Sequence, residues 1–219
     1  MDYSSGVEQA ARPERKGCLF RFILPPISVI LMGTLLALIL SQVNFNTVST
    51  APQPVEPSSS KSGIAPLFTP EVQAWEGKIL QWSERYDLDA NLIATVMQIE
   101  SCGNPRAVSP AGAQGLFQVM PYHFQSGEDP LAPGINAKRG LKYLRGALEA
   151  GGNVRLALAG YNGGIQGATR PQELWPAETR RYVYWGVGIY KDAKIGKSSS
   201  TRLDEWLGSG GKALCQSAD

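Results

Sequence analysis

From residue 69 onward, hydrophobic residues return every three or four positions, which is the period of an α-helix with one buried face. Thr69-Pro70-Glu71 is typical of a helix start, because threonine can cap the first turn, proline fits its first position and an early carboxylate suits its positive end. The apolar residues that then share one face are Val72, Trp75, Ile79, Trp82 and Tyr86. We therefore expect a first helix that begins after Thr69.

The same period recurs in four later segments, two of which follow residues that cap helices well. These segments lie after Asp89 as far as Gly103, after Asn136 as far as Gly151, and over about 154–160 and 177–192. Neither strand-like alternation nor an internal repeat occurs, so we predict a mainly α domain over residues 69–219. Its long loops, at 102–135 and 161–176, are of a length that usually carries function.

A continuous apolar segment precedes this domain. Residues 22–45 contain no charged residue, and a helix needs about 20 apolar residues to cross a membrane. Basic residues dominate the ten positions before the segment, whereas the first charge after it is Glu56. The positive-inside rule then makes 1–21 cytoplasmic, makes 22–43 a single-pass signal anchor in the cytoplasmic membrane, and places the domain outside. A cleaved signal peptide is the alternative, but the segment is long for one and lacks a good cleavage site.

The stretch between the anchor and the domain, residues 44–68, is rich in proline and serine. Such a composition buries too little apolar surface to offset the entropy lost on ordering. We expect a disordered linker that lets the domain reach away from the membrane.

Composition and charge exclude several classes of function. The 21 basic and 19 acidic residues are nearly balanced and form no basic stripe, so nucleic acid is not an expected partner. The single histidine, His123, has too few partners to suggest a metal site even with Glu128 and Asp129 nearby, and we expect neither metal nor cofactor. Cys102 and Cys215 both lie beyond the anchor, where thiols oxidise, so we predict a disulfide between them; two unpaired thiols are the alternative.

Glu100 is the residue with the clearest chemistry. It lies seven positions after Ile93 and four after Val96, so it continues the apolar face of its own helix. A carboxyl group in that position is partly desolvated, which raises its pKa and suits it to donate a proton. The alternative is a boundary glutamate whose carboxylate is satisfied by a neighbouring amide or arginine.

The segments around Glu100 resemble, in order and spacing, the soluble lytic transglycosylase (SLT) domain family, which is related to goose-type lysozyme. The resemblance covers about residues 72–192. The segments that carry it are Ile99-Glu100-Ser101, Asn104-Pro105, Ala107-Val108-Ser109, AGAQGLFQVMP at 111–121, Ala159-Gly160-Tyr161-Asn162-Gly163-Gly164 and Glu178-Thr179-Arg180-Arg181-Tyr182-Val183. Two positions depart from the family pattern, because Phe117 replaces the commoner methionine and Gly160 replaces alanine.

This resemblance implies a lysozyme-like α-domain that binds peptidoglycan glycan strands. We expect the protein to be a monomer, with this domain on the cell-wall side of the membrane. It implies cleavage of the β-1,4 bond between N-acetylmuramic acid and N-acetylglucosamine, with a 1,6-anhydromuramoyl product. Glu100 matches the family's single catalytic acid and base, and Tyr161 would assist it by stabilising developing charge. The residues expected to bind substrate are Ser101, Gln118, Met120, Asn162, Glu178 and Tyr182.

Two other functions remain open at this point. A hydrolytic muramidase of the goose-lysozyme kind would need a second carboxylate to position water, and Glu128 or Asp129 would be candidates. A non-catalytic peptidoglycan-binding protein would keep the cleft as a wall anchor, although such a protein has no need of a desolvated acid such as Glu100.

Overall fold

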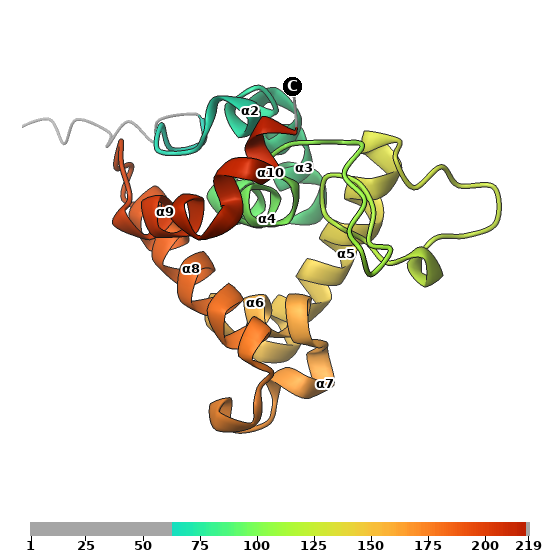
Figure 1. Cartoon of the computed structure of the whole chain (residues 1–219). Helices are drawn as coiled ribbons and strands as arrows, with labels where there is room; N and C mark the ends of the chain where they lie inside the picture. The colour runs from blue at the N-terminus through green and yellow to red at the C-terminus, as the bar shows by residue number, and fades with distance from the viewer. Residues whose placement is uncertain (1–62, 218–219) are drawn as a thin grey trace, which may run out of the picture. The chain divides into compact units, whose positions relative to one another are not determined.

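The computed structural model describes residues 63–217, which form a helical domain (Figure 1). The helices are α2 (Pro70–Gln73), α3 (Glu76–Tyr86), α4 (Ala90–Ser101), α5 (Pro133–Gly151), α6 (Val154–Gly163), α7 (Ile165–Ala168), α8 (Ala177–Lys194), α9 (Thr201–Trp206) and α10 (Lys212–Gln216). Shorter turns are η1 (Pro121–His123), η2 (Gln172–Leu174) and η3 (Leu207–Gly211). The described residues contain isolated β-bridges but no named strand, so the prediction of a mainly α domain is confirmed.

The predicted cytoplasmic segment, the signal anchor and most of the linker lie outside the described residues. Within 63–217, every helix is too short or too polar to span a bilayer.

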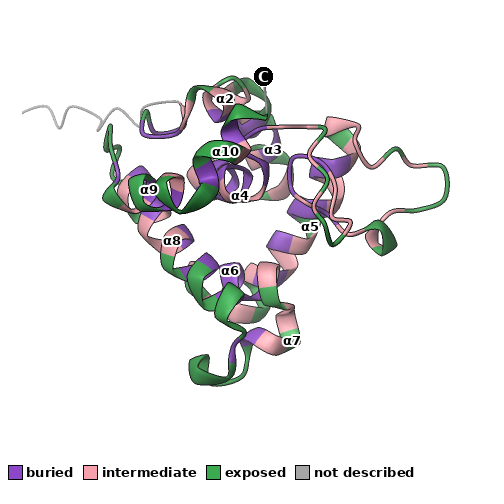
Figure 2. Cartoon of the chain, viewed as in Figure 1, coloured by how far each residue is buried: buried purple, intermediate pink, exposed green. Residues whose placement is uncertain are grey.

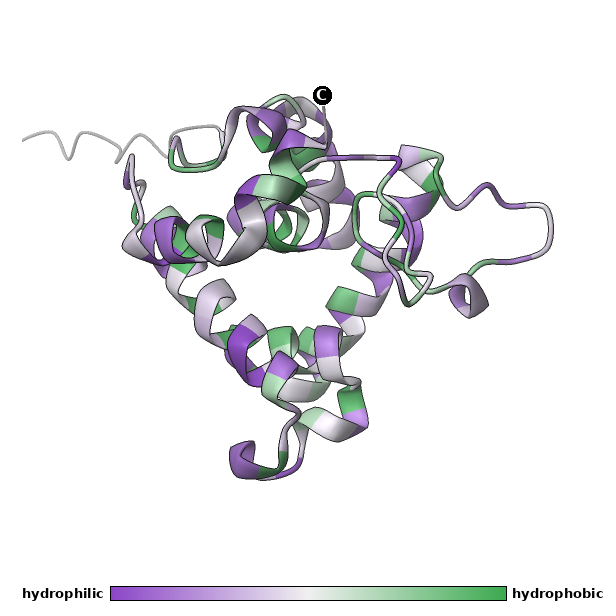
Figure 3. Cartoon of the chain, viewed as in Figure 1, coloured by the Kyte–Doolittle hydropathy of each residue, from purple (hydrophilic) through white to green (hydrophobic). Residues whose placement is uncertain are grey.

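Helix α4 is largely buried, since eight of its twelve residues are buried, and its ribbon carries the colours of buried and hydrophobic residues in Figures 2 and 3. Asp89 caps its start, because one carboxylate oxygen accepts hydrogen bonds from the amides of Asn91 (2.9 Å) and Leu92 (3.3 Å). The helix ends at Cys102, whose φ of 50° reverses the chain direction. The predicted cap and helix are confirmed, and the burial of α4 fixes the position of Glu100 in its last turn.

The first predicted helix is interrupted in the structure. Helix α2 ends at Gln73 and α3 begins at Glu76, so the apolar face is divided between two helices. Thr69 occupies the cap position without a side-chain capping bond, because its hydroxyl donates instead to Gln98 Oε1 on α4 (3.2 Å). The prediction of one continuous helix is therefore wrong.

The structure also corrects the end of the predicted linker. Ile64, Ala65, Leu67 and Phe68 are all buried in the hydrophobic core. Two backbone amides fix this segment, since Ile64 N donates to Glu76 Oε1 (3.0 Å) and Ala65 N donates to Asn91 Oδ1 (2.8 Å). Residues 63–68 thus belong to the folded domain, and the prediction that the linker extends to residue 68 is wrong.

Helices α5, α6 and α8 contribute residues to the cleft in which Glu100, at the C-terminal end of α4, lies. Helix α6 packs against both α5 and α8, and α8 packs against α4 (Figure 1). The predicted loop at 161–176 is shorter than expected, because α6 continues to Gly163 and α7 and η2 follow it. This arrangement holds one wall of the site on α5 and another on α6 and α8.

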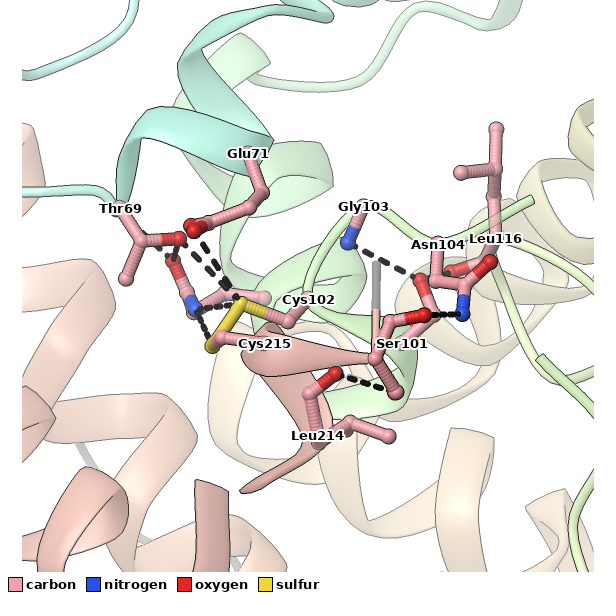
Figure 4. Close-up of a disulfide and its surroundings, with 11 residues drawn as sticks. Thr69, Glu71, Ser101, Cys102, Gly103, Asn104, Leu116, Leu214 and Cys215 are labelled. Atoms are coloured by element: carbon pink, nitrogen blue, oxygen red, sulfur yellow. Dashed lines mark hydrogen bonds between the residues drawn. A yellow bond between two sulfur atoms is a disulfide. The ribbon is translucent and has the colours of Figure 1, made fainter. Parts of the chain in front are cut away.

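The predicted disulfide between Cys102 and Cys215 is confirmed, and it joins the end of α4 to α10 (Figure 4). Asn104 adds a second link, because its Nδ2 donates to the carbonyl oxygen of Ser217 (2.7 Å). The C-terminal helix is therefore held against the turn that follows Glu100.

Candidate active site

A cleft of about 540 Å³ opens between the end of α4, the loop at 109–123 and the helices α5, α6 and α8. Six of the eight predicted site residues line it, namely Glu100, Gln118, Met120, Tyr161, Asn162 and Glu178. The other two, Ser101 and Tyr182, do not line it. The long loop and the helix ends thus bring together residues that are up to 78 positions apart in sequence.

Glu100 lies in the last turn of α4, where burial raises the pKa of its carboxyl group to about 8. The negative charge of Glu178 acts in the same direction, whereas an interaction with the Tyr182 hydroxyl lowers the pKa. At neutral pH, the carboxyl group is therefore mostly protonated and faces a cleft that can hold substrate. This is the state that a general acid requires.

Tyr182, on α8, interacts with Glu100 but does not line the cleft. The side chain is buried, and its hydroxyl interacts with the Glu100 carboxyl group without meeting full hydrogen-bond geometry. Burial raises the pKa of Tyr182 well above its ordinary value, so the hydroxyl keeps its proton. Tyr182 is thus placed to stabilise the Glu100 carboxylate once that group has lost its proton, rather than to bind sugar as predicted.

Tyr161, on α6, lines the cleft near Glu100, and its hydroxyl donates to the carbonyl oxygen of Phe117 (2.7 Å). This approach depends on Gly140 of α5, because a Cβ there would lie 3.0 Å from the Tyr161 hydroxyl and 2.6 Å from Phe117 Cβ. Burial, and then the charge of Glu100, raise the pKa of Tyr161 well above its ordinary value. With its proton committed to Phe117, the Tyr161 oxygen is left as an acceptor at the site.

We expect Tyr161→Phe to lower turnover by roughly 10- to 100-fold, because the hydroxyl that is predicted to assist Glu100 in the transition state is lost. The free energy of unfolding should fall by only about 1 kcal/mol, the usual contribution of one hydrogen bond. Steady-state kinetics and thermal denaturation measure the two effects. Unchanged turnover would show that the hydroxyl serves only to hold the Phe117 carbonyl.

Gln118 is held in a strained conformation, with a φ of 44° that non-glycine residues rarely adopt. Its side-chain Nε2 donates to the carbonyl oxygens of Ala107 (3.2 Å) and Gly115 (3.0 Å), which close the loop. The amide nitrogen is thus used within the protein, and Oε1 is the atom available to accept from a ligand. If Gln118 contacts a sugar as predicted, its Oε1 would accept the hydrogen bond and its Nε2 would not donate one.

Asn136 is the residue that positions this loop, although its sequence pattern predicted a helix cap. Helix α5 begins at Pro133, so Asn136 lies inside the helix and is fully buried. Its Oδ1 accepts from the amide of Phe117 (2.8 Å), and its Nδ2 donates to the carbonyl oxygens of Gln114 (2.7 Å) and Pro130 (2.9 Å). Gly115 permits this contact, because a Cβ there would lie 2.5 Å from Asn136 Nδ2. The capping prediction is wrong because tertiary hydrogen bonds claim the side chain.

Ser101 does not contact the cleft. Its side chain is fully buried, and its hydroxyl donates to the carbonyl oxygen of Leu116 (2.8 Å) and accepts from the amide of Gly103 (3.2 Å). Figure 4 shows Ser101 beside the disulfide and the turn after α4. The structure therefore gives Ser101 a place in fixing the loop, not in binding substrate as predicted.

The remaining predicted residues lie at the border of the cleft. Met120 and Asn162 are partly exposed, and Glu178 is exposed in the first turn of α8. Other lining residues that carry polar or aromatic side chains were not singled out for the site from the sequence, namely Ser109, Tyr122, His123, Arg139 and Tyr143. Arg139 and Tyr143 lie four positions apart on one face of α5, which is the spacing that could have indicated them.

The carboxylates that lie near His123 in sequence, Glu128 and Asp129, are engaged in hydrogen bonds. Glu128 accepts from Arg139 Nε on α5 (2.7 Å), and Asp129 Oδ1 accepts from the amide of Leu131 (3.0 Å), so both carboxylates have partners within the protein. Within the described part of the chain, one group of three candidate ligands occurs, formed by Glu71, Cys102 and Cys215. Its two sulfur atoms are bonded to each other, which removes them as thiolate ligands.

Comparisons with known proteins point to one family. Residues 77–179 match the family model described as the transglycosylase SLT domain. A transglycosylase of Enterobacteria phage PRD1 is 39% identical over 112 residues, which are 47% of this chain and 40% of the phage protein. Membrane-bound lytic murein transglycosylase C of Mannheimia succiniciproducens is 50% identical over 44 residues, 20% of this chain and 12% of that protein. The same enzyme of Histophilus somni is 44% identical over 61 residues, 27% of this chain and 16% of its own length.

The chain thus spans less than half the length of these relatives. The matched segment nevertheless includes every predicted site residue except Tyr182, which follows it by three positions. Residues 77–179 are therefore similar to the transglycosylase SLT domain.

Proposed function

We propose that the protein is a peptidoglycan lytic transglycosylase that cleaves the β-1,4 bond between N-acetylmuramic acid and N-acetylglucosamine. The observation that carries the proposal is Glu100, a protonated carboxyl group in a cleft formed by an SLT domain. The cleft is large enough for a few sugar units, and its lining is both polar and aromatic. We further propose that the domain has the lysozyme-like arrangement that the sequence predicts.

The proposed reaction uses Glu100 twice. Its carboxyl group first gives a proton to the oxygen of the scissile bond, so that the N-acetylglucosamine unit leaves with a new hydroxyl group. The resulting carboxylate then takes the proton of the muramoyl C6 hydroxyl while that oxygen closes onto C1. The product is a 1,6-anhydromuramoyl end, Glu100 is protonated again, and no water is consumed. One carboxyl group therefore suffices where most glycosidases need two.

The surroundings of Glu100 support both halves of this cycle. Burial keeps the proton on the carboxyl group before the first step. The Tyr182 hydroxyl then stabilises the carboxylate between the steps, because it interacts with that group and keeps its own proton. The oxygen of Tyr161 is free to accept a hydrogen bond, so we propose that it orients a sugar hydroxyl at the reacting centre.

A hydrolytic muramidase is the second candidate, and Glu178 is the observation that favours it. A hydrolase needs a second carboxylate that activates water. Glu128 and Asp129 do not line the cleft, whereas Glu178 does and is exposed at its border. Glu178 is therefore the residue that hydrolysis would require.

Product analysis separates the two candidates. Purified peptidoglycan is digested with the protein, and the muropeptides are weighed by mass spectrometry and tested for reducing ends. We expect muramoyl products that are one water lighter than hydrolysis products and that carry no reducing end. Fully hydrated, reducing products would replace the proposal with the muramidase, and no product on any peptidoglycan would favour a binding protein that anchors to the wall.

We also propose that residues 22–43 anchor the protein in the cytoplasmic membrane and that the catalytic domain faces the cell wall. The support is the charge asymmetry around the apolar segment, together with the membrane-bound enzymes among the relatives. Protease treatment of intact spheroplasts tests this topology, since an anchored domain is removed while residues 1–21 stay protected.

A further inference from the structure

One wall of the cleft combines aromatic rings with a positive charge. On η1, the rings of Tyr122 and His123 lie 4.5 Å apart, and His123 lies 5.2 Å from Tyr143 of α5. Tyr143 in turn lies 5.9 Å from Tyr161, so the row of rings continues to the neighbourhood of Glu100. All four rings line the cleft, and Tyr122 is 76% exposed at the outer end of the row. Such rings offer flat faces to sugars.

Arg139 lines the same wall, four positions before Tyr143 on α5. Of its five N–H donors, the one on Nε reaches an acceptor, at Glu128 Oε2 (2.7 Å), and no other has a partner among the described residues. Nη2 is shielded from solvent as well as unpartnered, a state that costs free energy unless an acceptor arrives. The guanidinium is therefore held by one bond and keeps unused N–H donors that can bind an anion.

The charge around Arg139 is not neutralised locally. Glu128 is shared, because Lys138 Nζ lies 3.3 Å from its Oε1 while Arg139 occupies its Oε2. Two cations thus face one carboxylate, and the group of Glu128, Lys138 and Arg139 carries a net positive charge. The opposite border of the cleft carries the carboxyl group of Glu178. An anionic group of a bound strand would therefore be favoured at the α5 wall.

We propose that Arg139 is the anion-binding residue of a subsite that recognises a carboxylate carried by the muramoyl unit, while the neighbouring rings pack against the sugars. This inference rests on the proposed function, because it names the part of peptidoglycan that the α5 wall of the cleft recognises. The carboxylate has two sources on such strands, the stem peptide or the lactyl group of a muramic acid without a peptide. The subsite would separate peptidoglycan from chitin, whose N-acetylglucosamine units carry no carboxylate.

The test measures binding of the full chain that carries Glu100→Gln, so that no strand is cleaved. The probes are peptide-bearing glycan strands, the same strands stripped by an amidase, and chitooligosaccharides. Adding Arg139→Gln should weaken binding by roughly tenfold where the recognised carboxylate is present and leave chitooligosaccharide binding unchanged. An effect confined to peptide-bearing strands assigns the stem peptide, and one confined to stripped strands assigns the lactyl group.

Lys138→Gln is the matched control. It removes one positive charge that is paired with Glu128, as Arg139→Gln does, but Lys138 does not line the cleft. Glu128→Gln is a second variant in case Arg139→Gln does not fold; it keeps an acceptor for Nε and should tighten binding of the carboxylate-bearing strand severalfold. The inference is overturned if Arg139→Gln affects all probes equally or none, if Lys138→Gln matches it, or if Glu128→Gln brings no tightening. Failure of the parent protein to bind any probe would overturn the proposed function itself, and this inference with it.

Discussion

Glu100→Gln is expected to lower cleavage of peptidoglycan by at least about 10³-fold, because the amide can neither give nor take the proton that both steps require. The glutamine has nearly the same size and keeps an oxygen for the Tyr182 hydroxyl, so the cleft should retain its shape. Binding of uncleaved strands should stay within a fewfold of wild type. The measurements are the rate of muropeptide release and the affinity for intact strands.

The same substitution should stabilise the folded protein in a way that depends on pH. In the folded state, the pKa of Glu100 is about 8, against 4.5 for the free side chain. Between these values, the unfolded chain loses its proton while the folded chain keeps it, so the wild type loses stability as pH rises from 4.5 to 8. The variant escapes this loss. Its advantage in the free energy of unfolding should be near zero at pH 4.5 and should grow by up to about 1.4 kcal/mol per pH unit toward pH 8.

Matched amide substitutions provide the control for Glu100→Gln. Glu128→Gln and Asp129→Asn change carboxylates outside the cleft, and Glu178→Gln changes one at its border. Each should reduce cleavage much less than Glu100→Gln. A loss at Glu178 as large as that at Glu100 would contradict the single-carboxylate mechanism and would point to activation of water. A Glu100→Gln protein that still cleaves strands would remove Glu100 from the chemistry altogether.

The sequence predicted best those features that depend on local chemistry. Asp89 caps α4 as expected, because the cap and the amides it binds are neighbours in sequence. The burial of Glu100 followed from its register on the apolar face of the same helix, and the raised pKa agrees with that burial. The residues that share the cleft were predicted from the motifs that resemble the SLT family. The spacing of residues along the chain does not by itself predict which distant residues lie together.

Long-range contacts explain what the sequence did not predict. Asparagine is a residue type that often caps helices, but the side chain of Asn136 instead forms hydrogen bonds with the backbone at 114–117 and 130. These partners are distant in sequence, so local sequence patterns do not predict the contacts. Ser101 follows the proposed acid directly but turns into the core, because a helix sends adjacent residues in different directions. The segment 64–68 directly follows a stretch rich in proline and serine, so the sequence assigned it to the linker. Its burial depends on packing against α3 and α4, which the sequence alone does not show.

The disulfide between Cys102 and Cys215 is expected to have the largest effect on stability. It closes a loop of 113 residues, and cross-links of that span constrain the unfolded chain by as much as roughly 4–5 kcal/mol. Cys102 also ends α4 two residues after Glu100, and Gln98 Nε2 lies 3.1 Å from its sulfur. Loss of the bond should therefore loosen the turn that follows the proposed acid as well as release α10.

Replacing both cysteines with serine, Cys102→Ser together with Cys215→Ser, avoids leaving a single reactive thiol. We expect the free energy of unfolding to fall by about 2–5 kcal/mol, measured by denaturant titration without reductant. Wild type in excess reductant should fall to a similar value, whereas the double variant should not respond to reductant, because Cys18 is then the one cysteine of the chain and cannot form a disulfide within it. Cleavage should drop more steeply with temperature in the variant, because the turn after α4 opens before the core does. A double variant within about 1 kcal/mol of wild type would show that Asn104, through its bond to Ser217, and the packing of α10 hold the C-terminus without the cross-link.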